Sequence, residues 1–262
     1  MKKTLRLLAA AIMLLSLIGC QKKAQSDYEY IKSKGKMLVG ITLFAPMNYQ
    51  DTDGNLIGFD TEFAKAAAAR LGVEADFVEI NWDLKETELT SKNIDCVWNG
   101  MTITETLKKN LSITNPYLQN RQILITKADK AEEYAKNTDG ISISAEHGSA
   151  GETIATTLGF FAKSKFTPVD SQTKALLEVK SGIADAAVVD YVISFGSIGE
   201  GTDFADLVMA DAILGEPELY GIAFRKGSDM TEKINKIISE MIADGSLKTI
   251  AEKYKLDGLL LD

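Results

Sequence analysis

The sequence predicts an α/β fold built on largely parallel sheets. Short apolar runs rich in β-branched residues alternate along the chain with longer segments in which apolar residues recur with a helical period. Single glycines end several of the helical segments, at Gly72, Gly182 and Gly245. Strands that are separated in this way by helices favour an α/β architecture whose strands run mostly parallel.

The first residues have the features of an export signal. Met1-Lys2-Lys3 gives a basic start, and the apolar run over 7–18 is too short for a comfortable transmembrane helix. The ending Leu17-Ile18-Gly19-Cys20 looks like a lipobox, at which bacterial lipoproteins are cut before the cysteine. We expect a lipoprotein signal peptide over 1–19, a lipid on Cys20 that anchors the protein to the extracytoplasmic face of the cell membrane, and a tether over 20–29. The alternative is a membrane-retained or plainly secreted protein whose Cys20 is incidental.

Composition excludes some partners and some kinds of site. Removal of 1–19 takes away three basic residues, so the formal charge of −8 becomes −11. A chain this acidic does not suit nucleic acid or anionic lipid headgroups. Cys96 is then the only cysteine besides Cys20, so we expect no internal disulfide, no metal site and no cofactor. Cys96 itself is predicted to be a small buried hydrophobe. The remaining chain is long enough for one large domain or two small lobes.

In the first half of the mature chain, turn and capping residues delimit the expected elements. Asp53-Gly54 predicts a hairpin turn, Asp60 the N-cap of a helix that Gly72 ends, and Thr102 with Glu105 a capping box. The expected strands are 37–41, 73–80 and 94–98, and the expected helices are 61–71, 83–92 and one that begins near 105.

The alternation continues in the second half. The expected strands are 122–126, 141–144, 186–189 and 220–224. The expected helices are 130–137, one after the loop 146–151, 171–181, and two near the C-terminus. The apolar faces of those two consist of Met230, Ile234, Ile237, Ile238 and Met241, and of Leu247, Ile250, Ala251 and Tyr254.

Candidate binding residues follow the predicted strands, where open α/β sheets place their sites. The loops 99–102 and 148–151 combine glycine with a helix start and suit a small anion such as a carboxylate, although ordinary helix caps explain each loop as well. Phe44 and Trp82 are flat walls for an apolar or cationic ligand part, or else core residues. Asp190 suits an ammonium group or caps the next helix, and the two roles can coexist.

Several short motifs occur in a characteristic order. They are Phe44-Ala45-Pro46-Met47, Asp53-Gly54-Asn55-Leu56-Ile57-Gly58-Phe59-Asp60, Asn99-Gly100-Met101-Thr102-Ile103-Thr104, Pro116-Tyr117, Val188-Val189-Asp190, Gly221-Ile222-Ala223-Phe224-Arg225-Lys226-Gly227, Met241-Ile242-Ala243-Asp244-Gly245-Ser246-Leu247 and Ala251-Glu252-Lys253-Tyr254. In this order and spacing they resemble the polar amino-acid substrate-binding proteins of ABC importers, the bacterial solute-binding proteins of family 3. The resemblance covers nearly the whole mature chain.

The resemblance implies the two-lobe periplasmic-binding-protein type II fold, with two hinge crossings and a central ligand cleft. Lobe 1 would comprise 30–119 and 220–262, and lobe 2 would comprise 120–219. The crossings would fall near 118–122 and 217–221.

The resemblance also implies roles for single residues. Phe44 would stack on the ligand, with Trp82 as a second stacking residue. Gly100 and Asp190 would hold an α-ammonium group, and Thr102 with Ser149 and Ala150 an α-carboxylate. Asn99 and Met101 complete the predicted ligand-binding stretch.

The sequence departs from the family pattern where a carboxylate would bind. Leu107 stands where relatives usually carry an arginine that clamps the α-carboxylate, Ala150 stands where a second hydroxyl is common, and Met47 replaces an aromatic residue. An arginine–carboxylate fork is the strongest contact of such a site. We expect Arg121 to restore the charge, with Lys108 as the alternative after a slip of one residue. The remaining possibility is a ligand that presents no free α-carboxylate there.

The function implied by the resemblance is transport without catalysis. The chain would be the monomeric ligand-binding subunit of an ABC importer, with a small polar ligand, an amino acid by preference, and with permease and ATPase subunits as partners. One alternative is an enzyme on the same scaffold, similar to the cyclohexadienyl dehydratases, with His147, Glu152 and Asp190 as acid–base groups. Another is a ligand sensor that kept the fold.

Overall fold

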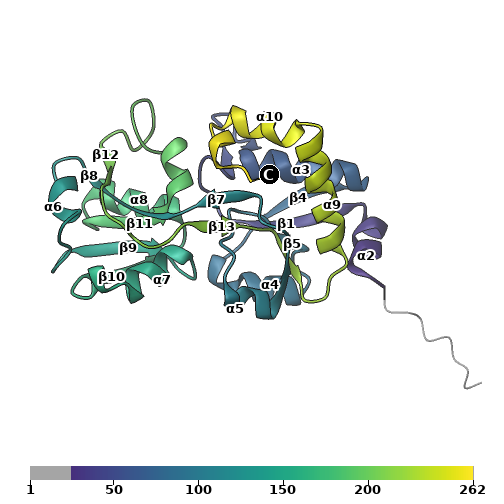
Figure 1. Cartoon of the computed structure of the whole chain (residues 1–262), viewed down its shortest axis with the longest axis horizontal. Coiled ribbons are helices and arrows are strands. Elements are labelled where there is room, and N and C mark those ends of the chain that lie inside the picture. The colour runs from purple at the N-terminus through teal and green to yellow at the C-terminus, as the bar shows by residue number, and fades with distance from the viewer. Residues whose placement is uncertain (1–24, 262) are drawn as a thin grey trace, which may run out of the picture.

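The chain folds into two lobes, each with a five-stranded sheet that helices cover on both faces (Figure 1). The computed structural model describes residues 25–261. The expected signal peptide and the lipid site at Cys20 lie outside the described residues. The two-lobe α/β fold predicted from the sequence is confirmed.

The first lobe combines both ends of the described chain. Its strands are β1 (Lys36–Ile41), β4 (Glu74–Glu79), β5 (Cys96–Val97), β6 (Leu111–Ile113) and β14 (Ala223–Arg225), in the order β4-β1-β5-β14-β6. Strand β1 runs parallel to β4 and β5, so the carboxyl ends of these three strands share one edge. Strand β14 lies antiparallel between β5 and β6 and returns the chain to this lobe.

Helices enclose the first sheet on two sides (Figure 1). One face carries α3 (Phe59–Leu71), α9 (Met230–Ala243) and α10 (Ser246–Lys253), and the other carries η1 (Trp82–Leu84), α4 (Lys85–Thr90) and α5 (Glu105–Asn110). The predicted apolar stripe of α9 is buried. Because that stripe recurs with the helical period, it faces the sheet along the whole helix. Cys96 is buried, as predicted.

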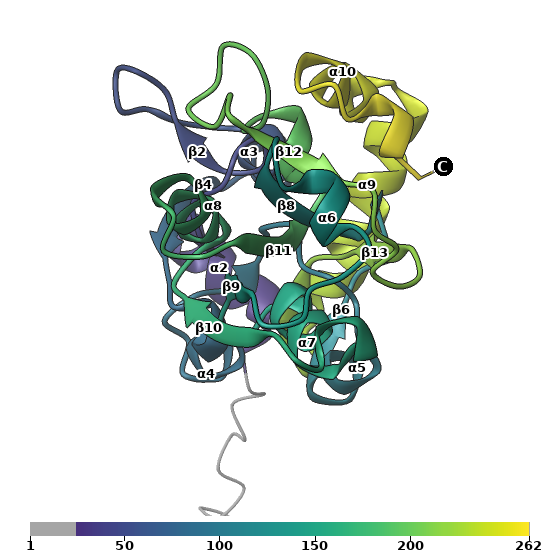
Figure 2. The same ribbon diagram turned by 90° about the vertical axis from the view of Figure 1, so that its left-hand side faces the viewer.

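The second lobe comprises β8 (Gln122–Lys127), β9 (Ser142–Glu146), β10 (Lys165–Val169), β11 (Ala186–Asp190) and β12 (Leu207–Ala210), in the order β10-β9-β11-β8-β12 (Figure 2). Successive side chains of strand β11 pack into two different hydrophobic clusters. Val189 belongs to the cluster that contains residues of α8 (Gln172–Ser181), and Val188 to the cluster that contains a residue of α7 (Ala150–Thr157). Both faces of this sheet are therefore covered, which explains the unbroken apolar run of β11. The remaining elements are α6 (Ala131–Tyr134), η2 (Gly159–Phe161) and η3 (Tyr191–Phe195).

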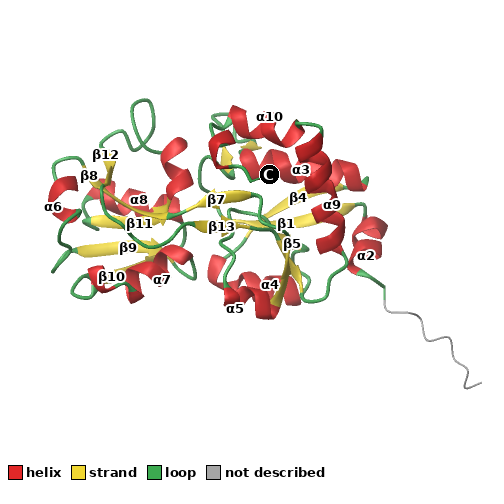
Figure 3. Ribbon diagram, viewed as in Figure 1, coloured by secondary structure: helices red, strands yellow, loops and turns green. Residues whose placement is uncertain are grey.

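Two short strands run between the lobes (Figure 3). They are β7 (Leu118–Asn120) and β13 (Glu218–Tyr220), which pair antiparallel. The expected strand over 220–224 is thus divided: its start belongs to this ribbon, and β14 belongs to the first sheet. The predicted turn at Asp53-Gly54 joins β2 (Tyr49–Gln50) to β3 (Leu56–Ile57), and η4 (Asp257–Leu259) follows α10.

Two capping assignments made from the sequence are wrong, and the capping alternative for Asp190 is not met either. Helix α3 begins at Phe59, and the buried carboxylate of Asp60 accepts hydrogen bonds from Gly100 N–H at 2.7 Å and from the Tyr117 hydroxyl at 2.9 Å. Thr104, not Thr102, caps α5, because its hydroxyl accepts from Leu107 N–H. The Asp190 side chain caps no helix. Each side chain has a distant partner that local spacing does not reveal.

Other differences lie at the edges of the fold. Helix α2 (Asp27–Lys34) begins within the segment expected as a tether, and a capping box between Ser26 and Glu29 explains its start. Strands β10 and β12 were not predicted. Each pairs with a neighbour on one side only, so it needs no continuous apolar pattern, and β10 contains Pro168.

Candidate functional site

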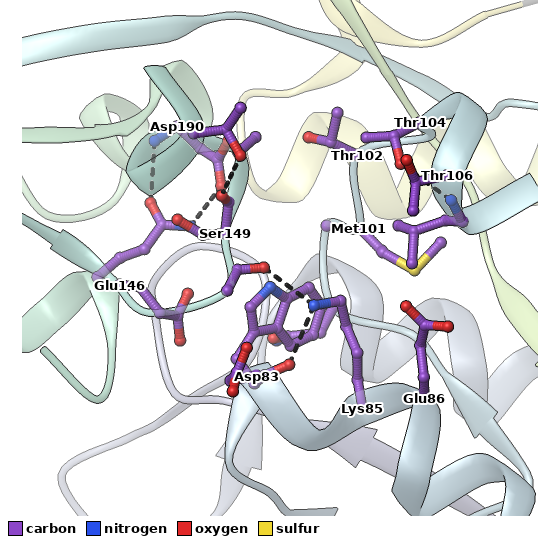
Figure 4. A pocket seen from close by; sticks show the side chains of 18 residues that line it. Asp83, Lys85, Glu86, Met101, Thr102, Thr104, Thr106, Glu146, Ser149 and Asp190 are labelled. Atoms are coloured by element: carbon purple, nitrogen blue, oxygen red, sulfur yellow. Dashed lines mark hydrogen bonds between the residues drawn. The ribbon is translucent and has the colours of Figure 1, made fainter. Parts of the chain in front are cut away.

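A cavity of about 420 Å³ lies between the lobes, beyond the carboxyl ends of strands from both sheets (Figure 4). The first lobe contributes residues within 82–107, and the second contributes residues within 146–153 together with Gln172 and Asp190. A volume in the range of about 300–1,000 Å³ is usual for sites that enclose small molecules. The cavity is therefore the candidate ligand site.

The structure brings together most of the residues singled out from the sequence. Those that line the cavity are Trp82, Asn99, Gly100, Met101, Thr102, Leu107, Ser149, Ala150 and Asp190. They converge because each follows a strand whose carboxyl end points into the cleft. Their contacts with a ligand stay predictions.

Phe44 and Arg121 do not line this cavity. Phe44 is buried in the core, with its ring directly behind Gly100, where an added Cβ would lie 3.1 Å from the ring. Arg121 is exposed and stacks on the Tyr191 ring, 4.4 Å from its centroid, beside a separate, smaller cavity. Lys108 is exposed too, and pairs with Glu105. The expectation that Arg121 or Lys108 restores a positive charge in the cleft is therefore not met by this geometry.

Asp190 is a buried carboxylate held by neutral donors. The amide groups of Asn120, Gln122 and Gln172 donate hydrogen bonds to it, the first two at 2.6 Å each. Glu218 accepts from the same two amides, at 3.2 Å from Asn120 and 2.9 Å from Gln122. Burial raises the pKa of Asp190 to about 7, and the negative charge of Glu218 adds to that rise. No described cationic side chain pairs with this carboxylate, so a cationic group of a ligand suits it.

Glu146 places a second buried carboxyl group in the cavity wall. It ends β9, is 2% exposed, and its Oε1 atom has no hydrogen-bond partner among the described residues. Burial raises its pKa to about 8, and the charge of Asp190 contributes to the rise. Figure 4 shows Glu146 and Asp190 on one side of the cavity and Thr102, Thr104 and Thr106 on the other.

The two loops predicted to bind an anion already donate to carboxylates of the protein. The Thr102 hydroxyl donates to Glu218 at 3.0 Å. In the other loop, Gly148 N–H donates to Glu152 at 2.6 Å, and the Ser149 hydroxyl accepts from Glu152 N–H at 3.1 Å. The second arrangement is a reciprocal cap at the start of α7.

The lobes touch at the rim of the cavity. The Lys85 ammonium group donates to the carbonyl oxygens of Trp82 at 3.1 Å and of Gly148, in the other lobe, at 2.9 Å. Burial lowers the pKa of Lys85. His147 lies between Glu152 at 2.9 Å and Asp83 of the first lobe at 3.4 Å, and its hydrogen bond to Glu152 raises its pKa. His147 thus has an ion-pairing role at the rim.

Sequence reasoning missed five charged residues of the site, namely Asp83, Lys85, Glu86, Glu146 and Glu218. Like Asp190, Glu146 is a carboxylate at the end of an apolar strand. The pattern that identified Asp190 could therefore have identified Glu146 as well. Lys85 and Glu86 lie on a short helix whose cavity-facing side the sequence does not specify. Glu218 reaches the site only because the two crossing strands pair.

Within residues 25–261, no group of three or more His, Cys, Asp or Glu side chains is arranged to hold a metal ion. The helices of this same part of the chain include none that combines the length and the apolar character needed to cross a membrane.

Comparison with known proteins connects this geometry to a family. A model of the bacterial extracellular solute-binding proteins, family 3, matches residues 37–257. The chain is 30% identical over 259 residues to the arginine-binding extracellular protein ArtP of Bacillus subtilis, a match that covers 97% of this chain and 98% of that protein.

Solved structures give the same likeness. The P235GK mutant of ArgBP from T. maritima superposes with a TM-score of 0.78 and 33% identity, covering 87% of this chain and 98% of that one. An ancestral amino acid-binding protein, described as a precursor of cyclohexadienyl dehydratase, gives a TM-score of 0.77 and 30% identity, covering 87% of this chain and 99% of that one. These likenesses to binding proteins do not favour the alternative of an enzyme.

Proposed function

Because the chain belongs to the bacterial extracellular solute-binding proteins of family 3, we propose that it captures a small polar ligand with a positively charged nitrogen and delivers it to the permease of an ABC importer. The observation that carries this proposal is Asp190, a buried carboxylate between the lobes that has only neutral hydrogen-bond donors around it.

The likenesses support an amino acid or a close derivative as the ligand. ArtP is named as arginine-binding, and arginine has a cationic side chain as well as an α-ammonium group. The cavity volume suits a molecule of that size. Trp82, Gly100 and Asp190 would surround the cationic end, and the closed lobes would exclude water from it.

The same proposal includes the arrangement of the whole chain. We assign lobe 1 to 30–119 and 220–262 and lobe 2 to 120–219, with the ribbon of β7 and β13 as the hinge. Cys20 would carry the lipid that holds the protein at the extracytoplasmic face of the membrane. The mass of the mature protein, produced in a bacterium from the full chain, tests this assignment. Cleavage elsewhere, or an unmodified Cys20, contradicts it.

The test of the proposed function begins with the ligand itself. The protein is purified, denatured, and any released small molecule identified by mass spectrometry; calorimetry then compares the parent with Asp190→Asn. We expect a cationic ligand, and we expect Asp190→Asn to weaken its binding by about 2–5 kcal/mol, since one partner of a buried charge pair is lost. The exposed Asp206→Asn is the matched control in the same lobe. Unchanged affinity in Asp190→Asn contradicts the proposed role.

A further inference from the structure

The charges that line the cavity are unbalanced. Four acidic side chains, Asp83, Glu86, Glu146 and Asp190, line it, whereas Lys85 is the one cationic side chain among the described residues that do so. Glu218 adds a further carboxylate directly behind Asp190, through the two amides that they share. A ligand that enters this cavity therefore meets more carboxyl groups than cationic groups.

The single cation is already engaged. The Lys85 ammonium group donates to two carbonyl oxygens, and Asp83, Glu86, Glu146 and Glu152 surround it closely enough to stabilise its charge. A lysine is a point charge without the two-pronged geometry that an arginine offers a carboxylate. Lys85 therefore joins the lobes at the rim of the cavity and has little capacity left for an anionic ligand.

The wall opposite Glu146 and Asp190 offers no other cationic side chain that could bind a ligand carboxylate. Leu107 presents an apolar side chain there and packs in a cluster with Trp82 and Met101. The Thr102 hydroxyl, which lies nearby, donates its hydrogen to Glu218. A ligand carboxylate at this wall would compete with Glu218 for the Thr102 hydroxyl. The Thr104 and Thr106 hydroxyls also line the cavity, but no cationic partner accompanies them.

The loop at the start of α7 is engaged in part by groups of the protein itself. Its Gly148 N–H donates to the Glu152 carboxylate, and the Ser149 hydroxyl accepts from Glu152. Glu152 thus occupies the Gly148 N–H, while the Ser149 hydroxyl, which lines the cavity, keeps its own hydrogen to donate to a ligand. Across the cavity wall, the Oε1 atom of buried Glu146 has no partner among the described residues and needs a donor.

Resting on the proposed function, we propose that the natural ligand is an organic cation without a free carboxylate, such as an amine, a diamine or a guanidinium compound. Asp190 with Glu218 forms one anionic centre for it, and Glu146 forms a second. The raised pKa values of Asp190 and Glu146 agree with this assignment, since burial is the largest cause of each rise and the nearby Lys85 does not offset it for Glu146.

Matched pairs of compounds test the inference. Calorimetry on the parent protein, freed of bound ligand by unfolding and refolding, compares arginine with agmatine, lysine with cadaverine and ornithine with putrescine; each pair differs only in the carboxylate. We expect at least one amine to bind about tenfold or more tightly than its amino acid, because the carboxylate lacks a cationic partner. An amino acid that binds as tightly as its amine, or a co-purified ligand with a free carboxylate, overturns the inference but leaves the proposed function standing.

Leu107→Arg is the variant that should reverse the preference. It supplies a forked donor at the apolar wall, so arginine should gain on agmatine by about tenfold or more. Leu177→Arg, at a half-exposed position on α8, is the control for the added charge. An unaltered ratio in a folded Leu107→Arg protein counts against the inference. If no cation binds the parent and a neutral or anionic compound does, the proposed function fails as well.

Discussion

Three buried carboxyl groups, Asp60, Glu146 and Asp190, should make the stability of the protein depend on pH. Their hydrogen bonds come mostly from neutral groups: Gly100 N–H and the Tyr117 hydroxyl serve Asp60, and amide side chains serve Asp190. Burial raises the pKa of Asp60 and Asp190 to about 7 and that of Glu146 to about 8. These groups therefore titrate near neutral pH when the cavity holds no ligand.

Stability of the ligand-free protein should fall as the pH rises from 5 to 8. In the unfolded chain these carboxyl groups titrate near pH 4, so between pH 4 and their raised values the folded state binds more protons than the unfolded state. The free energy of unfolding then decreases with pH, by about 1.4 kcal/mol per pH unit for each of these groups that is protonated in the folded state and ionised in the unfolded chain. Urea unfolding at several pH values measures this slope.

Glu146→Gln is the diagnostic variant for that slope. Its amide does not titrate, so the decrease between pH 5 and 8 should become shallower, while the exposed Asp206→Asn should leave it unchanged. His147 acts in the same direction, because its raised pKa stabilises the folded state only while it is protonated, and it must be replaced separately. A parent whose stability is constant or rises over this range contradicts the prediction.

At the scale of elements, the loop after β9 and the short helix η1 form one of the contacts between the lobes; others are the hydrogen bonds from Thr173 to the Leu43 carbonyl and from Ser197 to the Ala45 carbonyl. Gly148 has φ of +72°, and a Cβ added there would lie 2.7 Å from the Asp83 Cα atom. At Gly148 the backbones of the two lobes thus approach each other so closely that a Cβ atom does not fit between them.

Gly148→Ala should weaken ligand binding by pushing the lobes apart. Gly140→Ala is a matched control, since Gly140 has φ of +81° and open space where the Cβ would lie. Both variants carry a similar backbone cost of about 1 kcal/mol or more, but Gly148→Ala alone should lose affinity, by about tenfold or more. Calorimetry with thermal unfolding separates the two effects. Equal affinities in the two variants contradict the inter-lobe contact.

Elements with a strong local pattern were predictable, and those without one were not. The stripe on α9 and the apolar run of β11 identify a helix and a strand from residue types alone. Strands β10 and β12 form by pairing with a neighbouring strand of the sheet, β9 and β8 respectively, and not because of a pattern of their own. The cap assigned to Asp60 failed for a related reason, since its partners at Gly100 and Tyr117 are distant in sequence.

At the scale of the whole molecule, the site depends on contacts that no local pattern reveals. Leu107 and Asp190 were identified because each lies next to a sequence motif of its own lobe. The pairing of Thr102 with Glu218 and of Lys85 with the Gly148 carbonyl requires the two segments of each pair to meet in space. Sequence analysis therefore identified much of the cavity lining but not the balance of charge on which the proposed ligand class rests.

The last prediction concerns motion of the lobes. The two crossings, β7 and β13, form a narrow ribbon, whereas each lobe has its own sheet and helices. A rotation about the ribbon would separate Lys85 from Gly148 and His147 from Asp83 without unpacking either sheet. Thr173 and Ser197 also donate across the lobes, to the Leu43 and Ala45 carbonyl oxygens. The His147–Asp83 pair is half exposed and contributes little by itself.

A ligand that bridges the lobes should therefore shift the population toward the closed form. Small-angle scattering should show a smaller radius of gyration at saturating ligand than without it. Gly148→Ala, which obstructs the rim, should show a smaller change than Gly140→Ala at the same saturation. Identical scattering curves of the parent with and without ligand would mean that the lobes stay in contact throughout, and that the ligand enters the cavity by another route.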